Sequence, residues 1–131
     1  MMLGTPTPIL RSFDETRAKA FYLDFLGFEL LFEHRFAPDL PLYMAMRHGD
    51  CEIHVSEHYG DATPGSAIRI PVDDVAAYAA RLRAKNFGNA RPGEPARMPW
   101  GSREITIQDP AGNRLTFYTN NPPGEASDGT V

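Results

Sequence analysis

The sequence predicts an α+β fold in which two consecutive βαβββ modules form a curved mixed sheet. Two amphipathic helical stretches open at acidic residues, Asp14 and Asp73, which lie about 59 positions apart, as in a repeated supersecondary unit. Each stretch follows a short apolar segment. Each is followed by segments in which apolar and polar residues alternate, which is typical of strands with one buried face. We expect one domain over residues 1–119.

The first module is predicted to span residues 5–57 and to open with a strand at 7–12. The carboxylate of Asp14 can accept from free N–H groups of a first helical turn, so the helix is expected to begin there. Gly27 stands where a left-handed C-terminal cap is expected. Helical spacing gives this helix one apolar face, made of Ala18, Phe21, Tyr22 and Phe25. Three strands are expected after it, at 28–32, 42–46 and 51–56.

The second module is predicted to span residues 66–119, after a linker at 57–66 that is rich in Gly, Asp, Thr and Pro. A strand at 67–72 comes first, and a helix follows with its apolar face at Val75, Tyr78, Ala79 and Leu82. The last two strands alternate on either side of a tight turn at 109–113. Residues 120–131 are rich in Pro, Gly and Ser and are expected to form a disordered tail.

Composition narrows the function classes. The net charge of −4 argues against nucleic acid or an anionic membrane surface as a partner. A single cysteine, Cys51, excludes an intrachain disulfide and a cysteine-rich zinc site. The first residues lack the basic start and apolar core of a signal peptide, and no apolar run reaches the length of a bilayer span. We therefore expect a cytoplasmic protein.

Motifs for catalysis are missing from the sequence. It contains no G-x-S-x-G nucleophile elbow and no glycine-rich phosphate loop. His54, Glu57 and His58, with Glu52, have the composition of a metal site. On a strand, however, His54 and Glu57 point to opposite sides, so a solvated strand end explains this cluster better.

Two motifs give the chain a family resemblance. One is Phe13-Asp14-Glu15-Thr16-Arg17-Ala18-Lys19-Ala20-Phe21-Tyr22, and the other is Pro99-Trp100-Gly101 followed by the turn Asp109-Pro110-Ala111-Gly112-Asn113. Together they resemble the bleomycin-resistance branch of the glyoxalase/bleomycin-resistance/dioxygenase (vicinal oxygen chelate) superfamily, from about Pro8 to about Tyr118. This resemblance implies a homodimer that binds a small molecule.

The resemblance also bears on metal binding. In metal-dependent members, four positions on the inner sheet faces supply His or Glu ligands, and here they hold Thr7, His54, Ala67 and Thr116. Catalytic metal sites need about three protein ligands, and only His54 is a good one. We therefore expect no metal and no cofactor. The implied function is stoichiometric sequestration of a bleomycin-like antibiotic, without catalysis.

Several residues are candidates for the ligand site. By resemblance, Trp100 stacks on a flat ring of the ligand, although it could also cover a hydrophobic cluster. A wall of aromatic rings and a floor of polar groups are expected to complete the site, and core packing explains the aromatic rings equally well. The wall is Phe32, Phe36 and Tyr43; the floor is His54, Thr106 and Thr116; and Arg103 and Glu104 lie at the rim.

The resemblance implies that the N-terminal strand is exchanged between subunits at Pro8, where an ordinary edge-strand proline is the alternative. One departure concerns the loop after Phe32, which carries one acid and two basic groups, so a cationic antibiotic would be attracted less strongly than in the resistance proteins. Two other functions stay open. One is a metal-dependent lyase, isomerase or dioxygenase around His54, and the other is a protein-interaction module.

Overall fold

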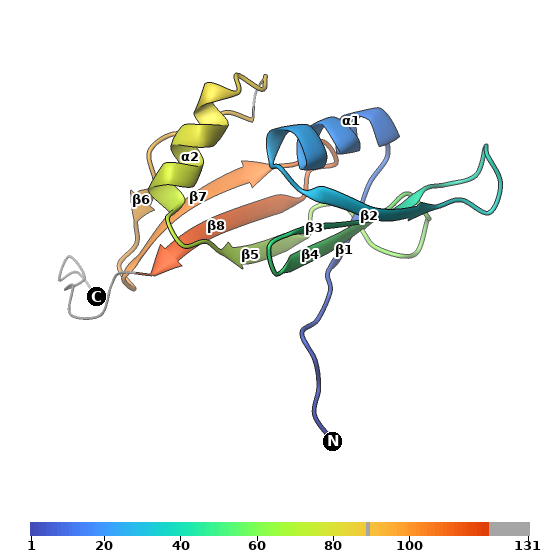
Figure 1. The fold of residues 1–131 in the computed structure, drawn as a ribbon, viewed down its shortest axis with the longest axis horizontal. Helices are drawn as coiled ribbons and strands as arrows, with labels where there is room; N and C mark the ends of the chain where they lie inside the picture. The colour runs from blue at the N-terminus through green and yellow to red at the C-terminus, as the bar shows by residue number, and fades with distance from the viewer. Residues whose placement is uncertain (89, 121–131) are drawn as a thin grey trace. The chain divides into compact units, whose positions relative to one another are not determined.

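The computed structural model describes residues 1–88 and 90–120 and divides the chain into two compact units. Unit 1 comprises residues 1–66 together with 109–113, and unit 2 takes the rest of the chain. Each unit contains one four-stranded mixed sheet with helix on one side (Figure 1). The predicted α+β fold with two βαβββ modules is therefore confirmed. The module boundaries 5–57 and 66–119 stay a prediction, and the expected tail lies almost entirely outside the described residues.

The sheet of unit 1 has the strand order β1-β4-β3-β2. The first strand pairs parallel with β4, and the other pairs are antiparallel. β2 is an edge strand and all six of its residues are exposed, whereas β3 and β4 bury Met44, Met46, Ile53 and Val55. The strands are β1 at Ile9–Arg11, β2 at Glu29–His34, β3 at Tyr43–His48 and β4 at Cys51–Ser56.

The helix of unit 1 has two parts, an α-helix α1 at Glu15–Lys19 and a π-helix η1 at Ala20–Phe25. As predicted, the Asp14 carboxylate caps it by accepting from the Arg17 N–H, and Gly27 takes a left-handed φ of 88° after its end. The predicted apolar face, Ala18, Phe21, Tyr22 and Phe25, is buried in the core. The wide π turn is visible in the bond from the Leu26 N–H to the carbonyl of Phe21, five residues back.

Unit 2 repeats the same order, with the sheet arranged β5-β8-β7-β6. Here β5 pairs parallel with β8, and the helix packs on the side where Ile105, Ile107, Leu115 and Phe117 are buried. The elements are β5 at Ala67–Pro71, α2 at Val75–Ala84, β6 at Ala96–Arg97, β7 at Ser102–Gln108 and β8 at Arg114–Asn120.

One expected correspondence between the modules was wrong. Asp74, not Asp73, caps α2 by accepting from the Ala77 N–H, so the two caps are 60 residues apart rather than 59 (74 minus 14). At the helix ends, Gly27 and Asn86 both have positive φ and are 59 apart (86 minus 27). The first helix thus has one residue more, and its π turn accommodates that residue. Superposing the two modules with a single offset of about 59 residues could not reveal this extra residue.

The turn at 109–113 is held by a buried carboxylate. Asp109 accepts from the Tyr22 hydroxyl at 2.6 Å, from the Asn113 side chain at 2.9 Å, and from the N–H groups of Ala111 and Asn113. Asn113 in turn donates to the Arg11 carbonyl. Burial and the neighbouring Asp109 carboxylate raise the pKa of Tyr22 well above its ordinary value. The most distinctive motif of the sequence is therefore a structural anchor within unit 1.

No helix among the described residues is both long enough and apolar enough to cross a lipid bilayer.

Candidate functional site

In unit 2, the sheet face away from α2 carries a polar cluster centred on Glu104. This face is formed by alternate residues of β5, β7 and β8. The Glu104 side chain is only 5% exposed, and both of its oxygens accept hydrogen bonds from the Arg69 guanidinium, at 3.1 and 2.7 Å. Ser102 Oγ and the indole Nε1 of Trp100 also donate to Glu104 Oε2, at 2.6 and 3.1 Å. These donors lower the pKa of Glu104 to about 2, with the Arg69 bond as the largest cause.

Trp100 lies in the turn just before β7, and the cluster fixes its orientation. The bond to Glu104 holds the indole N–H edge, while 64% of the residue stays exposed to solvent. Gly101, next to it, has a φ of 96°, a conformation that side chains larger than hydrogen disfavour. From the sequence, Trp100 could also have covered a hydrophobic cluster instead of stacking on a ligand. The exposed fraction and the buried carboxylate fit a presented ring surface better.

Arg69 and two threonines continue this face. The Arg69 guanidinium lies 4.5 Å from the centre of the Tyr118 ring, so it is held by the ring and by Glu104 while half of its side chain stays exposed. Thr116 is the register partner of Arg69 on β8, and its hydroxyl is 2.9 Å from that of Thr106. Trp100, Thr106 and Thr116 thus share one face of unit 2, and their role in a ligand site stays a prediction.

The corresponding face of unit 1 carries a chain of hydrogen bonds through His54. Its Nε2 lies 2.6 Å from a Glu52 carboxylate oxygen, and its Nδ1 lies 2.6 Å from the Tyr43 hydroxyl. Because a carboxylate only accepts, Nε2 carries the proton, and in the neutral ring Nδ1 accepts from Tyr43. Burial, together with the charges of Asp61 and Glu52, raises the pKa of Tyr43.

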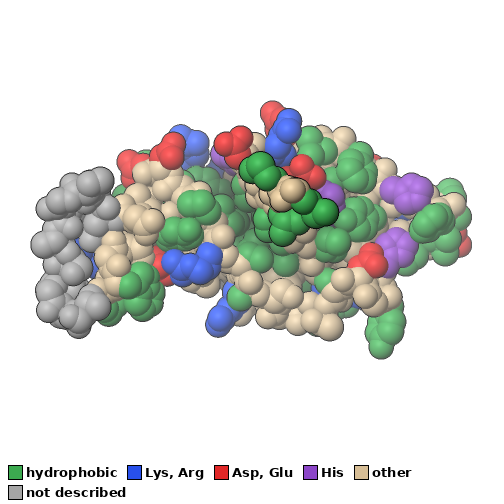
Figure 2. Space-filling model, turned by 90° about the horizontal axis from the view of Figure 1, so that it is seen from below, with side chains coloured by type: hydrophobic (Ala, Val, Ile, Leu, Met, Phe, Trp, Pro, Cys, Tyr) green, Lys and Arg blue, Asp and Glu red, His purple; other side chains and the backbone are tan. Residues whose placement is uncertain are grey.

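Aromatic rings extend the unit 1 face outward along β2. Phe32 is stacked on Tyr43 with ring centres 6.4 Å apart and is edge-on to His54 at 5.8 Å. Phe36 is 76% exposed and contacts the rings of His34 and His58. Figure 2 shows histidine and hydrophobic side chains lying next to each other on the face that it draws. The predicted wall residues Phe32 and Tyr43 therefore meet the predicted floor residue His54 within unit 1, whereas Phe36 belongs to a separate ring cluster.

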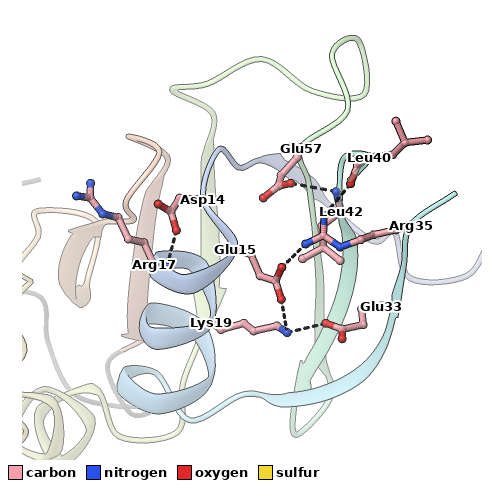
Figure 3. Close-up of polar contacts among 9 residues, drawn as sticks. All are labelled: Asp14, Glu15, Arg17, Lys19, Glu33, Arg35, Leu40, Leu42 and Glu57. Atoms are coloured by element: carbon pink, nitrogen blue, oxygen red, sulfur yellow. Dashed lines mark hydrogen bonds and ion pairs between the residues drawn. The ribbon is translucent and has the colours of Figure 1, made fainter. Parts of the chain in front are cut away.

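An ion network holds the loop that carries Phe36. Lys19 lies 2.8 Å from both Glu15 and Glu33, and Arg35 pairs with Glu15 and donates to the Leu40 carbonyl (Figure 3). Glu57 accepts from the Leu42 N–H at the far end of the loop. Within this network the charges of Glu15 and Glu33 are balanced by those of Lys19 and Arg35.

The residues present do not fit a catalytic divalent metal. Of Thr7, His54, Ala67 and Thr116, only His54 is a good ligand, and both of its ring nitrogens already have hydrogen-bond partners. Within residues 1–88 and 90–120, no three His, Cys, Asp or Glu side chains gather closely enough to hold a metal ion.

Sequence reasoning missed part of the unit 2 cluster. Arg69, Tyr118 and Ser102 were not candidates, and Glu104 was placed only at the rim, although it is the buried centre. Register across β5, β8 and β7 brings Arg69 and Glu104 together, and nothing in the local sequence signals it. Arg103 is exposed, and strand alternation directs it to the face opposite Glu104.

Tandem βαβββ modules, each with helix on one side of a mixed sheet, define the class of protein to which this structure corresponds. The family model described as glyoxalase superfamily protein matches residues 2–124. The chain belongs to the glyoxalase superfamily.

Solved structures with the same fold include antibiotic-binding proteins. The bleomycin-binding protein of Streptomyces verticillus, complexed with copper(II)-bleomycin, is 28% identical, with a TM-score of 0.68 over 93% of this chain and 99% of that one. TnmS3, an antibiotic-binding protein from Streptomyces sp. CB03234, is 25% identical, with a TM-score of 0.68 over 92% and 100%. A bleomycin resistance determinant encoded on transposon Tn5 is 23% identical, with a TM-score of 0.70 over 92% and 100%, and shows the shared fold. Comparison with curated protein sequences gives no match.

Proposed function

We propose that this chain is a metal-independent binding protein that sequesters an antibiotic through a flat aromatic group, with bleomycin as the first compound to test. One observation carries the proposal: the ring of Trp100 is exposed, yet its edge is fixed by the buried Glu104. A ring that is already oriented loses little conformational entropy when a ligand stacks on it. Similarity to the two antibiotic-binding proteins at 25% and 28% identity supports the same conclusion.

The proposal does not include catalysis. His54 is the only imidazole at the family's metal-ligand positions, and its nitrogens are taken by Glu52 and Tyr43. Elemental analysis of protein purified with added Zn, Ni, Mn and Fe checks this point. We expect substoichiometric metal that is unchanged in His54→Ala. About one equivalent of metal per chain, lost in that variant, would instead support the superfamily's enzymes.

We further propose a cytoplasmic homodimer in which the N-terminal segment is exchanged at Pro8. Residues 1–7 form neither helix nor strand and extend away from the sheet of unit 1, with Met1, Met2 and Leu3 exposed (Figure 1). The edge strand β2 exposes Leu30, Leu31 and Phe32, and such an edge usually has a partner. Native mass spectrometry should show two chains in the main species, and removal of residues 2–7 should shift it toward one.

Binding is tested by titration with bleomycin. Trp100 is the only tryptophan, so quenching of intrinsic tryptophan fluorescence reports on this ring alone. Calorimetry should show that Trp100→Ala weakens binding about tenfold or more, because stacking on an aromatic ring contributes on the order of 1 kcal/mol beyond burial. Tyr59→Ala is the control, since Tyr59 is a 98% exposed ring in unit 1. No quenching and no heat at saturating bleomycin would remove bleomycin as the ligand.

A further inference from the structure

The sheet face of unit 2 that carries the polar cluster has two cations that can still donate hydrogen bonds, Arg69 within the cluster and Arg114 on the same face. Arg69 uses two of its five N–H groups on Glu104 and keeps a half-exposed side chain. Arg114 opens β8 two residues before Thr116, on the same sheet face, about 7 Å along the strand. Arg114 is exposed, and its guanidinium has no hydrogen-bond or ion-pair partner among residues 1–88 and 90–120. Both guanidinium groups can therefore receive a ligand.

No acid on this face is accessible to a cation. Within the described part of β5, β7 and β8, Glu104 is the only carboxylate, and it is 6% exposed. Its two oxygens already accept from Arg69, Ser102 and Trp100. A cationic group placed here would meet two arginines and no free carboxylate, which is unfavourable.

Resting on the proposed binding function, we infer that the ligand is an aromatic acid: its ring stacks on Trp100 while its carboxylate, sulfonate or phosphate binds Arg69 and Arg114. The positions fit this pairing, because the Trp100 indole nitrogen and one Arg69 nitrogen lie within 3.1 Å of the same Glu104 oxygen. Thr116 is opposite Arg69 in register and two residues after Arg114 on the same face, so its hydroxyl can donate to the same anion. An arginine fork matches planar oxyanions well.

The net charge of −4 does not decide ligand preference. At physiological ionic strength, charges farther away than about 8 Å are largely screened, so the nearest groups dominate. The Arg69 guanidinium is fixed by the Tyr118 ring, over which it lies, and by its hydrogen bonds to Glu104. Because it is already fixed, binding an anion costs less entropy.

Three probes with one ring system test the inference: 2-naphthoate, 2-naphthamide and 2-naphthylmethylammonium. Calorimetry gives each Kd, and the single indole N–H signal in the ¹H–¹⁵N spectrum shows whether Trp100 is contacted. We expect naphthoate to bind about five- to tenfold more tightly than the amide, and the ammonium to bind most weakly. Added salt should reduce the preference for naphthoate.

Substitutions then locate the anion. Arg114→Gln removes a charge from an exposed residue and should reduce the preference for naphthoate two- to threefold (about 0.5 kcal/mol), with the Kd of the amide unchanged. Arg69→Gln should abolish the preference, and its indole signal should be compared with wild type because Glu104 loses a partner. Arg97→Gln is the matched control, since alternation directs this exposed arginine to the opposite face of the same sheet.

The outcomes separate the inference from the proposed function. Equal affinity for all three probes, or tightest binding of the ammonium, would overturn the aromatic-acid inference and leave ring stacking on Trp100 in place. Binding of bleomycin without binding of any naphthalene probe would also overturn the inference alone. A stationary indole signal with every probe and with bleomycin would overturn both.

Discussion

The two sheets place different chemistry on the same backbone positions. In unit 1, Ile9 pairs with His54, and in unit 2, Arg69 pairs with Thr116 at the matching register. His54 on β4 and Thr116 on β8 are therefore corresponding residues. Two residues before them stand Glu52 in unit 1 and Arg114 in unit 2. On the neighbouring antiparallel strands, β3 and β7, Tyr43 of unit 1 corresponds to Glu104 of unit 2. From unit 1 to unit 2, an acid thus corresponds to a base at one position (Glu52 and Arg114), and a neutral ring corresponds to an acid at another (Tyr43 and Glu104).

This comparison teaches how the repeat has diverged. Both modules keep the helix cap, the strand order and the buried apolar face, because these determine whether each unit folds. The opposite sheet face differs between the units: unit 1 carries rings and an imidazole where unit 2 carries a fixed guanidinium and hydroxyls. The two modules therefore share their fold but not the chemical groups that they present on the sheet face away from the helix.

The two units also bury a carboxylate differently. Asp109, counted with unit 1, accepts only from neutral groups, namely a tyrosine hydroxyl, an amide side chain and two backbone N–H groups. Glu104 of unit 2 accepts from a guanidinium as well as from a hydroxyl and an indole. The first arrangement fixes a turn, and the second fixes side chains of the proposed site. Substitutions at these two carboxylates therefore test two different sources of stability, a set of neutral donors at Asp109 and an ion pair at Glu104.

The largest effect is expected for Asp109→Ala. The substitution leaves four donors without their acceptor, two of them backbone N–H groups of the turn, and buried unpaired donors cost about 1 kcal/mol or more each. We expect the free energy of unfolding to fall by about 3 to 4 kcal/mol, measured by urea denaturation. Asp39→Ala, at an exposed loop position, is the control and should change it by less than about 0.5 kcal/mol. A small loss in Asp109→Ala would show that the turn does not depend on this carboxylate.

The next effect is expected for Glu104→Gln and depends on pH. The pKa of Glu104 is about 2 in the folded chain and about 4.3 when unfolded, so its charge stabilises the fold above about pH 4.3. This contribution, about 2 kcal/mol after allowing for solvent around Arg69, is lost as the pH falls toward 2. Urea midpoints between pH 7 and 2.5 should therefore fall more for wild type than for the variant. Parallel pH profiles would contradict the assigned role.

Much of the fold could be predicted because it depends on local signals. Alternation gave the strands around 51–56 and 114–118, and spacing gave the buried helix face that includes Phe21 and Phe25. The π turn could not be foreseen, since one extra residue changes no local preference. Trp100 was predicted as a site residue from its motif. Glu104 was predicted only as a rim residue, because its burial as the anchor of Trp100 depends on Arg69, 35 residues away. Contacts that depend on the register between strands cannot be predicted from the sequence of any single segment.

A smaller effect is expected for Tyr43→Phe in unit 1. Loss of the hydroxyl removes the donor to His54 Nδ1, and one such hydrogen bond contributes about 1 kcal/mol to stability. Tyrosinate absorbance gives a second measurement, because burial raises the pKa of Tyr43, as it raises that of Tyr22. The variant should lose one of the late-titrating tyrosines while keeping the naphthoate preference of unit 2. A change in that preference would show that the two faces do not act separately.

The smallest effect on global stability is expected for Arg35→Ala, which opens the ion network of unit 1. These side chains are partly exposed, so the pairs contribute about 0.5 kcal/mol, and salt should reduce that contribution. Arg35 also donates to the Leu40 carbonyl within the loop, so amide hydrogen exchange of residues 36–42 should become faster while β3 and β4 stay protected. Arg17→Ala is the matched control, since the Asp14 cap uses its backbone N–H rather than its guanidinium. Exchange that is equally fast in wild type would show that the network does not order the loop, and Phe36 would then have no fixed place on unit 1.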